Sequence, residues 1–352
     1  MILNPQLLHL TNLRNLLYSL MTDSTKIQNP KQSHLQPNLS QTDKMTGYFT
    51  WPPICSYYFM TLTWIKLNFK FLFKKSGILV GTLYSILGFI ATWCSLENIF
   101  SPDTTIWCKI AISSSILLGI FILSFIGMAI WYYFNNSVCV LEKGNGKKVY
   151  VRYGDFIKEL KRNGERRNFI IPANRCFDTI VDDRIISTNT IHGQFLKHIY
   201  STNLFSPDGL SSTIERKLLN YSKQQLTHEE KPAGNKNRYP IGTIVDIGSM
   251  RNNHYYLLGL TTFDQDLTAH TSKEDFILAI QRMIIYCNKH SQGYPVVLPL
   301  IGSGLARTNI SKNEVLKYLI RAFEINKDII NCDFHIVVWE KDKENTTITN
   351  LK

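Results

Sequence analysis

Two long stretches without charge dominate the pattern of hydrophobic and polar positions. Residues 76–96 and residues 110–141 contain no Asp, Glu, Lys or Arg. A membrane-spanning helix needs about 20 consecutive apolar residues, and a core helix of a soluble protein rarely extends so far without a charge. The pattern therefore predicts two transmembrane helices, at residues 77–96 and 110–134.

The segments beside these two helices predict how they are oriented. Residues 45–76 combine aromatic side chains with lysines, a mixture that favours the membrane interface. The connecting loop at residues 97–109 holds a single lysine. Cytoplasmic flanks carry an excess of basic residues, so we expect a protein of the inner membrane with two spans and a cytoplasmic C-terminal domain. The basic residues that flank the pair are Lys66, Lys70, Lys74, Lys75, Lys143, Lys147 and Lys148.

From residue 147 onward, short apolar runs alternate with amphipathic stretches. Alternation of this kind predicts an α/β domain at residues 147–340, with a mixed, largely parallel sheet flanked by helices. The polar residues after 340 are expected to be frayed. The expected strands are 148–153, 169–171, 241–247, 255–263, 296–300 and 333–339, and the expected helices are 192–200, 213–221, 272–290 and 313–326.

Residues 1–44 are predicted to be a polar, disordered N-terminal extension. Residues 23–43 are polar and include two prolines. The leucine-rich part before them is interrupted by Asn12 and Arg14 and lacks a small-residue cleavage site, which argues against a signal peptide. The composition changes after Met45, so this extension is a candidate upstream addition to the reading frame.

Charge and cysteine content narrow the classes of partner. The chain has 352 residues and a net charge of +12. Much of the excess lies beside the apolar helices, so we expect it to face a membrane and not a nucleic acid. The seven cysteines show no CxxC or Cys/His ligand spacing, so neither a metal site nor a disulfide framework is expected.

Two stretches repeat one pattern of apolar strand, proline and polar loop. Residues 168–178 read NFIIPANRCFD, and residues 296–304 read VVLPLIGSG. In open α/β sheets, ligands bind at the carboxyl ends of the strands. A glycine-rich loop before a helix lets backbone amides approach a phosphate, although GSG alone is often a tight turn. Together the two stretches predict a nucleotide pocket at this edge of the sheet.

A few polar residues near the strand ends are candidates for ligand contacts. Asp155 can accept a hydrogen bond from an adenine amino group, or it can cap a helix. Asn174 can hold a ribose hydroxyl or form a turn, and Asp178 follows it in the same loop. His192 and Gly193 open a predicted helix, where the glycine lets a phosphate approach the amides, although His192 could equally be an exposed residue at the helix end.

These motifs follow an order that resembles the macro domain. GDF at residues 154–156 is followed by PAN at 172–174, HG at 192–193 and P-x-x-GSG at 299–304. With its membrane hairpin, the chain is most similar to the divergent macro domains fused behind two membrane helices in Thoeris-type bacterial anti-phage effectors. The resemblance covers roughly residues 147–340 and the hairpin architecture, and leaves out the N-terminal extension.

The resemblance implies how an ADP-ribose-type ligand is held. Asp155 is expected to meet adenine, Asn174 to lie near the distal ribose, and two loops to hold the phosphates. No catalytic residue, metal or cofactor is implied. The full set of candidate ligand-binding residues is Asp155, Ala173, Asn174, Asp178, His192, Gly193, Gly302, Ser303, Gly304 and Leu305.

Two departures from the family pattern argue against hydrolysis more than against binding. The usual Asn-Ala-Ala-Asn reads IPAN at residues 171–174, so its first asparagine is missing. The usual glycine triplet before the helix is replaced by STNTIH at residues 187–192. ADP-ribosyl hydrolases of this fold use both features to position a water molecule.

The leading hypothesis is a membrane-anchored anti-phage effector and not an enzyme. In the family that the chain resembles, a TIR-domain enzyme makes the signal from NAD, and the signal carries ADP-ribose linked to an amino acid such as histidine. Binding to the macro domain then disrupts the membrane and kills the infected cell. Two helices are too few to enclose a pore, so a homo-oligomer is expected. The alternatives are a membrane-tethered ADP-ribosyl or nucleotide hydrolase and, more weakly, a docking module for ADP-ribosylated proteins.

Overall fold

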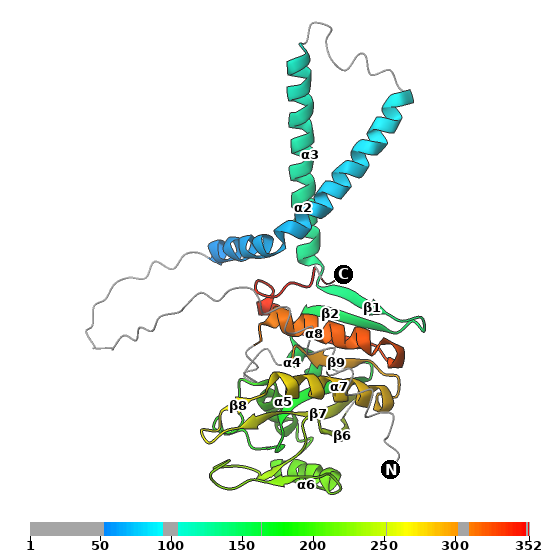
Figure 1. The fold of residues 1–352 in the computed structure, drawn as a ribbon. Helices are drawn as coiled ribbons and strands as arrows, with labels where there is room; N and C mark the ends of the chain where they lie inside the picture. The colour runs from blue at the N-terminus through cyan, green and yellow to red at the C-terminus, as the bar shows by residue number, and fades with distance from the viewer. Residues whose placement is uncertain are drawn as a thin grey trace, which may run out of the picture. The chain divides into compact units, whose positions relative to one another are not determined.

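The computed structural model describes residues 53–93, 105–162, 164–250, 252–301, 310–349 and 351 (Figure 1). The predicted extension at 1–44, the start of the predicted interfacial segment and the predicted phosphate loop at 302–305 lie outside these residues. Two apolar helices come first in the described chain, and an α/β domain follows them.

Helices α2 (Pro53–Trp93) and α3 (Ile106–Phe134) are the long apolar elements. Within them, Leu62–Ile90 and Ile106–Phe134 have mean hydropathies of 1.2 and 2.3, and most of their side chains are exposed. Both are therefore long and apolar enough to cross a membrane.

One helix replaces two of the predicted segments. Helix α2 runs without a break through the described parts of the interfacial segment, 45–76, and of the first span, 77–96. Its aromatic, leucine and lysine residues are compatible with a helix, and Pro53 stands at its start, where proline is tolerated. Trp64 and Leu72 of α2 are buried against Ala129 of α3, so the two apolar helices share a small core.

A mixed sheet forms the centre of the α/β domain. The spatial order of its strands is β1-β2-β10-β9-β3-β7-β6, with β8 paired to β7. The five central strands, from β2 to β7 in this order, are parallel, whereas β1, β6 and β8 are antiparallel to their neighbours. The strands are β1 (Ser137–Glu142), β2 (Lys148–Gly154), β3 (Arg167–Asn174), β6 (Ile244–Met250), β7 (Asn253–Phe263), β8 (Ala269–His270), β9 (Val296–Pro299) and β10 (Phe334–Trp339). A separate short pair consists of β4 (Gln224–Gln225) and β5 (Asn237–Arg238).

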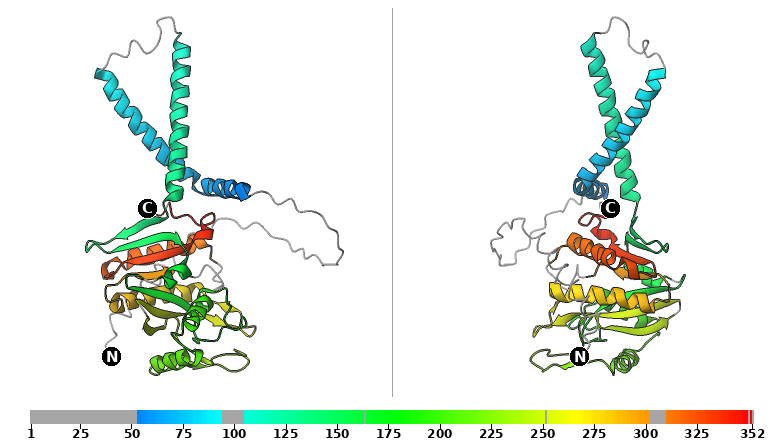
Figure 2. Two further views of the ribbon diagram at one scale, coloured as in Figure 1. Left: turned by 180° about the vertical axis from the view of Figure 1, so that it is seen from behind. Right: turned by 45° about the vertical axis from the view of Figure 1, so that its right-hand side comes forward.

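Helices cover the sheet on both faces (Figure 2). The helices of the domain are α4 (Phe156–Lys161), α5 (Ile191–Ser201), α6 (Pro207–Leu218), α7 (Lys273–His290) and α8 (Lys312–Ile325). Helices α4, α5 and α6 share a core with Phe169 and Ile171 of β3. Successive strand residues point to opposite faces, so the fully buried Ile170 faces the other layer. Helices α7 and α8 pack against each other there through Phe276 and Tyr318.

Both ends of the domain differ from the sequence-based boundaries. The sheet begins with β1 at Ser137 and not at residue 147, because residues 143–146 form a tight turn that pairs β1 with β2. The polar residues after 340, expected to be frayed, are held by specific contacts. Ile348 is fully buried, and the Tyr153 hydroxyl donates a hydrogen bond to the carbonyl oxygen of Thr346 at 2.6 Å.

Candidate functional site

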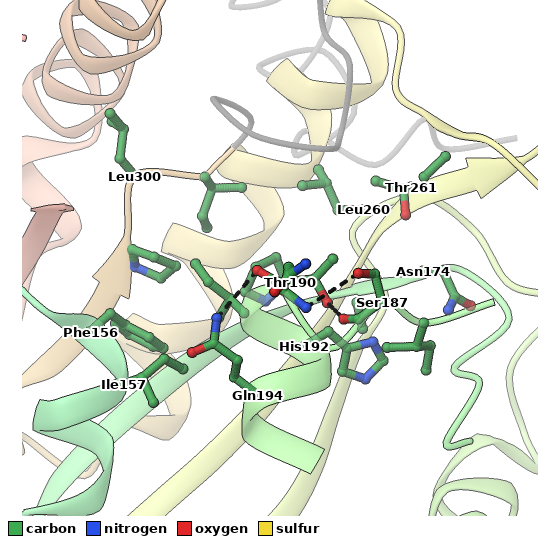
Figure 3. A pocket seen from close by; sticks show the side chains of 18 of the residues that line it. Phe156, Ile157, Asn174, Ser187, Thr190, His192, Gln194, Leu260, Thr261 and Leu300 are labelled. Atoms are coloured by element: carbon green, nitrogen blue, oxygen red, sulfur yellow. Dashed lines mark hydrogen bonds between the residues drawn. The ribbon is translucent and has the colours of Figure 1, made fainter. Parts of the chain in front are cut away.

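A cavity of about 650 Å³ opens at the carboxyl ends of the parallel strands (Figure 3). Its wall includes Gly154 of β2, Asn174 of β3, Thr261 of β7, Pro299 of β9 and Trp339 of β10. These strands run in one direction, so their carboxyl ends meet at the same edge of the sheet, where ligands bind in open α/β folds. The volume is that of a site for a small-molecule ligand.

The loop before α5 forms another wall of this cavity. Thr190 caps the helix because its Oγ1 accepts a hydrogen bond from Gly193 N at 2.9 Å and donates one to Ser187 O at 2.7 Å (Figure 3). A Cβ atom on Gly193 would lie 2.2 Å from Ser187 O, so glycine is required for this close approach. The cap engages the Gly193 amide, and we therefore assign Gly193 to loop packing, whereas Ser187 and Gln194 line the cavity.

Asp155 both caps α4 and lines the cavity. Its Oδ1 accepts hydrogen bonds from Ile157 N at 3.0 Å and Lys158 N at 3.1 Å. Its Oδ2 lies 3.9 Å from the exposed ammonium group of Lys158, which is a weak contact. The capping alternative from the sequence is therefore confirmed, and Oδ2 is the oxygen that can accept a hydrogen bond from a ligand.

Ala173 and Asn174 lie at the end of β3, both nearly buried and both in the cavity wall. The side-chain oxygen of Asn174 accepts a hydrogen bond from Cys176 N at 3.0 Å, so the asparagine forms the turn that follows the strand. Its amide nitrogen is the group that can donate to a ligand hydroxyl. Figure 3 shows Asn174 and Thr261 on one side of the cavity and Phe156 and Ile157 on the other.

The structure places Asp178 in a buried ion pair and not in the described cavity wall. The Lys231 ammonium group, which is fully buried, donates to Asp178 Oδ2 at 2.9 Å and to Ala233 O at 2.8 Å. Asn235 N donates to Asp178 Oδ1 at 2.6 Å. Burial raises the pKa of Asp178, and Lys231 and Asn235 oppose that rise. We therefore assign Asp178 to holding the 231–235 loop, in place of the predicted ligand contact.

His192 is buried in the cavity wall, which settles one alternative from the sequence. It is not an exposed histidine at a helix end. Burial lowers its pKa to about 4, so the imidazole is neutral near pH 7 and adds no positive charge for a phosphate.

The charged part of the wall was only partly found from the sequence. Arg184 and Lys312 are the cations among the described lining residues, and Asp155, Asp183 and Asp342 are the carboxylates. Lys312 and Asp342 form an ion pair, with Nζ 2.6 Å from Oδ1. They follow the predicted GSG loop and the last strand, but their pairing depends on two segments far apart in the sequence.

The predicted phosphate loop lies next to the cavity wall along the chain. Pro299, Leu300 and Ile301 line the cavity, and Gly302, Ser303, Gly304 and Leu305 follow outside the described residues. Their assignment as phosphate ligands therefore stays a prediction. In the part of the chain that the structure describes, no group of three or more His, Cys, Asp or Glu side chains is placed to hold a metal ion.

The fold and the cavity together define a class of protein. A mixed sheet with parallel central strands, helices on both faces and a pocket at the strand ends is the arrangement of a macro domain, here preceded by two helices long enough to span a membrane.

Comparison with known proteins gives the family. Residues 149–339 match the family model described as Thoeris protein ThsA, Macro domain, and the chain belongs to this family. The Thoeris protein ThsA of Bacillus amyloliquefaciens (strain Y2) is 27% identical over 218 residues, which is 60% of this chain and 68% of that protein.

Solved structures give a more distant similarity. Two variants of the Oceanobacillus iheyensis macrodomain, one determined with ADPR, each have a TM-score of 0.38 and 10% identity, and each comparison covers 59% of this chain. The comparisons cover 88% and 93% of those chains.

Proposed function

We propose that this protein is a membrane-anchored sensor-effector of anti-phage defence whose macro domain binds an ADP-ribose-type nucleotide. The single observation that carries the proposal is the cavity of about 650 Å³ at the carboxyl ends of five parallel strands, within residues that belong to the ThsA macro-domain family. Helices α2 and α3 supply a membrane anchor of sufficient length. The signal and the membrane response are expectations from the family resemblance.

The geometry supports one orientation of the nucleotide. Trp339 is half exposed at the cavity wall and lies opposite Gly154 in the pairing of β10 and β2, next to Asp155. An indole face can stack on a base, and such stacking contributes about 1–3 kcal/mol per base. We therefore expect the adenine between Trp339 and Asp155 Oδ2, with the distal ribose toward Asn174 and the diphosphate between them.

The signal nucleotide is expected to be made from NAD by a TIR-domain enzyme that acts through the nucleotide alone. The ligand is ADP-ribose or an amino-acid conjugate of it, such as histidine-ADP-ribose. Binding changes the assembly of α2 and α3 among several copies of the chain, because two helices cannot enclose a pore. The membrane is then disrupted, and the infected cell dies before the phage is released.

Isothermal titration calorimetry tests the binding step. The full chain in detergent is titrated with ADP-ribose, histidine-ADP-ribose and NAD, and the nucleotides are recovered afterwards and separated by chromatography. We expect saturable binding of at least one ADP-ribose compound and recovery of that compound intact. Conversion of the nucleotide with turnover would favour the hydrolase alternative, and no binding of any of the three would contradict the proposal.

A further inference from the structure

One ion pair belongs both to the nucleotide cavity and to the last segment of the domain. Lys312, the first residue of α8, and Asp342 line the same cavity, and Lys312 Nζ lies 2.6 Å from Asp342 Oδ1. The Asp342 side chain is 13% exposed and that of Lys312 is 35% exposed. The Asp342 side chain is thus buried more deeply than the Lys312 side chain.

Asp342 and α8 hold residues 340–349, which we call the tether segment. The carbonyl oxygen of Asp342 accepts hydrogen bonds from Asn345 N at 2.9 Å and Thr346 N at 2.8 Å. Asn313, the neighbour of Lys312, donates to Asn345 O at 2.8 Å and accepts from Thr347 N at 3.2 Å. The first turn of α8 therefore fixes both the start and the middle of the tether segment.

The same segment contacts both apolar helices. The hydroxyl groups of Thr347 and Thr349 donate to the side-chain oxygen of Asn68 in α2, which is fully buried. Lys343 Nζ donates to the carbonyl oxygen of Tyr133 in α3, and it lies 4.2 Å from the centre of the Tyr133 ring. Hydrogen bonds of the tether segment therefore connect it to α8 on one side and to α2 and α3 on the other.

Lys312 is one of two lysine or arginine side chains among the described residues that line the cavity. Among the described lining residues, Asp155, Asp183 and Asp342 outnumber Arg184 and Lys312. Asp155 caps α4, and Asp183 Oδ1 accepts a hydrogen bond from Thr188 N at 2.6 Å. A diphosphate that enters this wall needs a cation, and it competes with Asp342 for the ammonium group of Lys312.

We propose that Lys312 binds the anionic group of the nucleotide and gives up its ion pair with Asp342 when it does so. Loss of this ion pair loosens the tether segment and its contacts with α2 and α3. The inference rests on the proposed nucleotide function and adds to it the residue that transmits binding. The ligand shifts the equilibrium because it contacts Lys312 only in the loosened state, which gives it a higher affinity for that state. Asp342 is then an internal competitor of the ligand.

The experiment uses the full chain in lipid nanodiscs with ADP-ribose as the probe. Asp342→Asn removes the competitor and should bind ADP-ribose about tenfold more tightly, whereas Lys312→Met should bind about tenfold more weakly, the scale of one hydrogen bond to a charged group. Lys317→Met is the matched control, because Lys317 is an exposed lysine of α8 outside the cavity wall, and it should leave the affinity unchanged.

Hydrogen exchange of residues 343–349 reports on the tether segment. Exchange there should be faster in both cavity variants than in the wild type without ligand, and ADP-ribose should accelerate it in the wild type. The two variants should change the affinity in opposite directions and hydrogen exchange in the same direction. This combination distinguishes replacement of Asp342 by the nucleotide from a general loss of structure. The wild-type measurement does not depend on how well either variant folds.

Two results separate failure of this inference from failure of the proposed function. Wild-type protein that binds none of the three nucleotides, ADP-ribose, histidine-ADP-ribose and NAD, would contradict both. If the wild type binds ADP-ribose, two results would contradict only the replacement of Asp342 by the nucleotide. One is hydrogen exchange in residues 343–349 that stays constant or slows on binding, and the other is an Asp342→Asn variant that binds no more tightly than the wild type.

Discussion

At His192, burial opposes the charged form of the side chain. Burial lowers its pKa to about 4, compared with an ordinary value of 6.5. Between these two values the unfolded chain binds a proton that the folded protein does not, so stability falls as the pH drops from about 6.5 to about 4. The shift corresponds to about 3 kcal/mol.

Replacing this histidine should flatten the acid part of the stability profile. His192→Gln removes the proton that only the unfolded chain binds. Between pH 6.5 and pH 4, the free energy of unfolding of the variant should therefore fall by about 3 kcal/mol less than that of the wild type. Chemical denaturation of both proteins at a series of pH values measures the difference. Equal slopes in the two proteins would show that His192 takes up a proton in the folded state.

Asp155 has two roles that one pair of substitutions can separate. Asp155→Ala removes the cap of α4, at a cost of about 1 kcal/mol, and also removes the carboxylate oxygen that we propose accepts a hydrogen bond from adenine. Asp155→Ser keeps an oxygen for the cap but is too short to reach the base. We expect Asp155→Ser to keep the melting temperature of the wild type and to lose about 1–3 kcal/mol of ADP-ribose affinity, measured by calorimetry. Wild-type affinity in Asp155→Ser would leave Asp155 with the capping role alone.

Among the structural elements, the loop at residues 231–235 contains a buried ion pair with Asp178, made by Lys231. Lys231→Met leaves Asp178 buried without a counter-ion, and removal of one partner of such a pair typically costs about 3–5 kcal/mol. Asp178→Asn combined with Lys231→Met removes both charges and should recover much of that loss. Thermal unfolding of the two single variants and the double variant measures the coupling. Additive losses would show that the pair does not hold the loop.

The sequence predicted most of the elements because their signals are local. The run at residues 169–171 and the amphipathic stretch at 272–290 each contain their own pattern, and β3 and α7 form there. Strand β1 was missed because it has only six residues and is separated from an apolar helix of 29 residues by no more than Asn135 and Asn136.

The site was harder to predict because it depends on contacts between distant segments. Asp155, Ala173, Asn174 and His192 line the cavity because they stand at strand and helix ends, which a sequence pattern can locate. The partner of Asp178 lies 53 residues away, and Lys312 and Asp342 are 30 residues apart. No periodicity encodes such pairings.

At the scale of the whole molecule, the orientation of the hairpin can be tested by labelling. In a background with all native cysteines replaced by alanine, Asp103→Cys should react with an impermeant thiol reagent added outside intact cells, and Ser211→Cys in α6 should react only after lysis. The lysines that flank the hairpin are the reason for this orientation. The reverse labelling pattern would place the macro domain outside the cytoplasm.

Release of a dye from liposomes tests the central claim most directly, because it joins the nucleotide cavity to the membrane in one measurement. The full chain is reconstituted with the macro domain outward into liposomes that contain a self-quenched dye, and ADP-ribose or histidine-ADP-ribose is added. A fragment that begins at Ser137 and lacks α2 and α3 serves as the control. We predict release only when the full chain and a nucleotide are both present, with the nucleotide recovered intact. Release without nucleotide, equal release by the fragment, or no release by a full chain that binds the nucleotide would contradict the account.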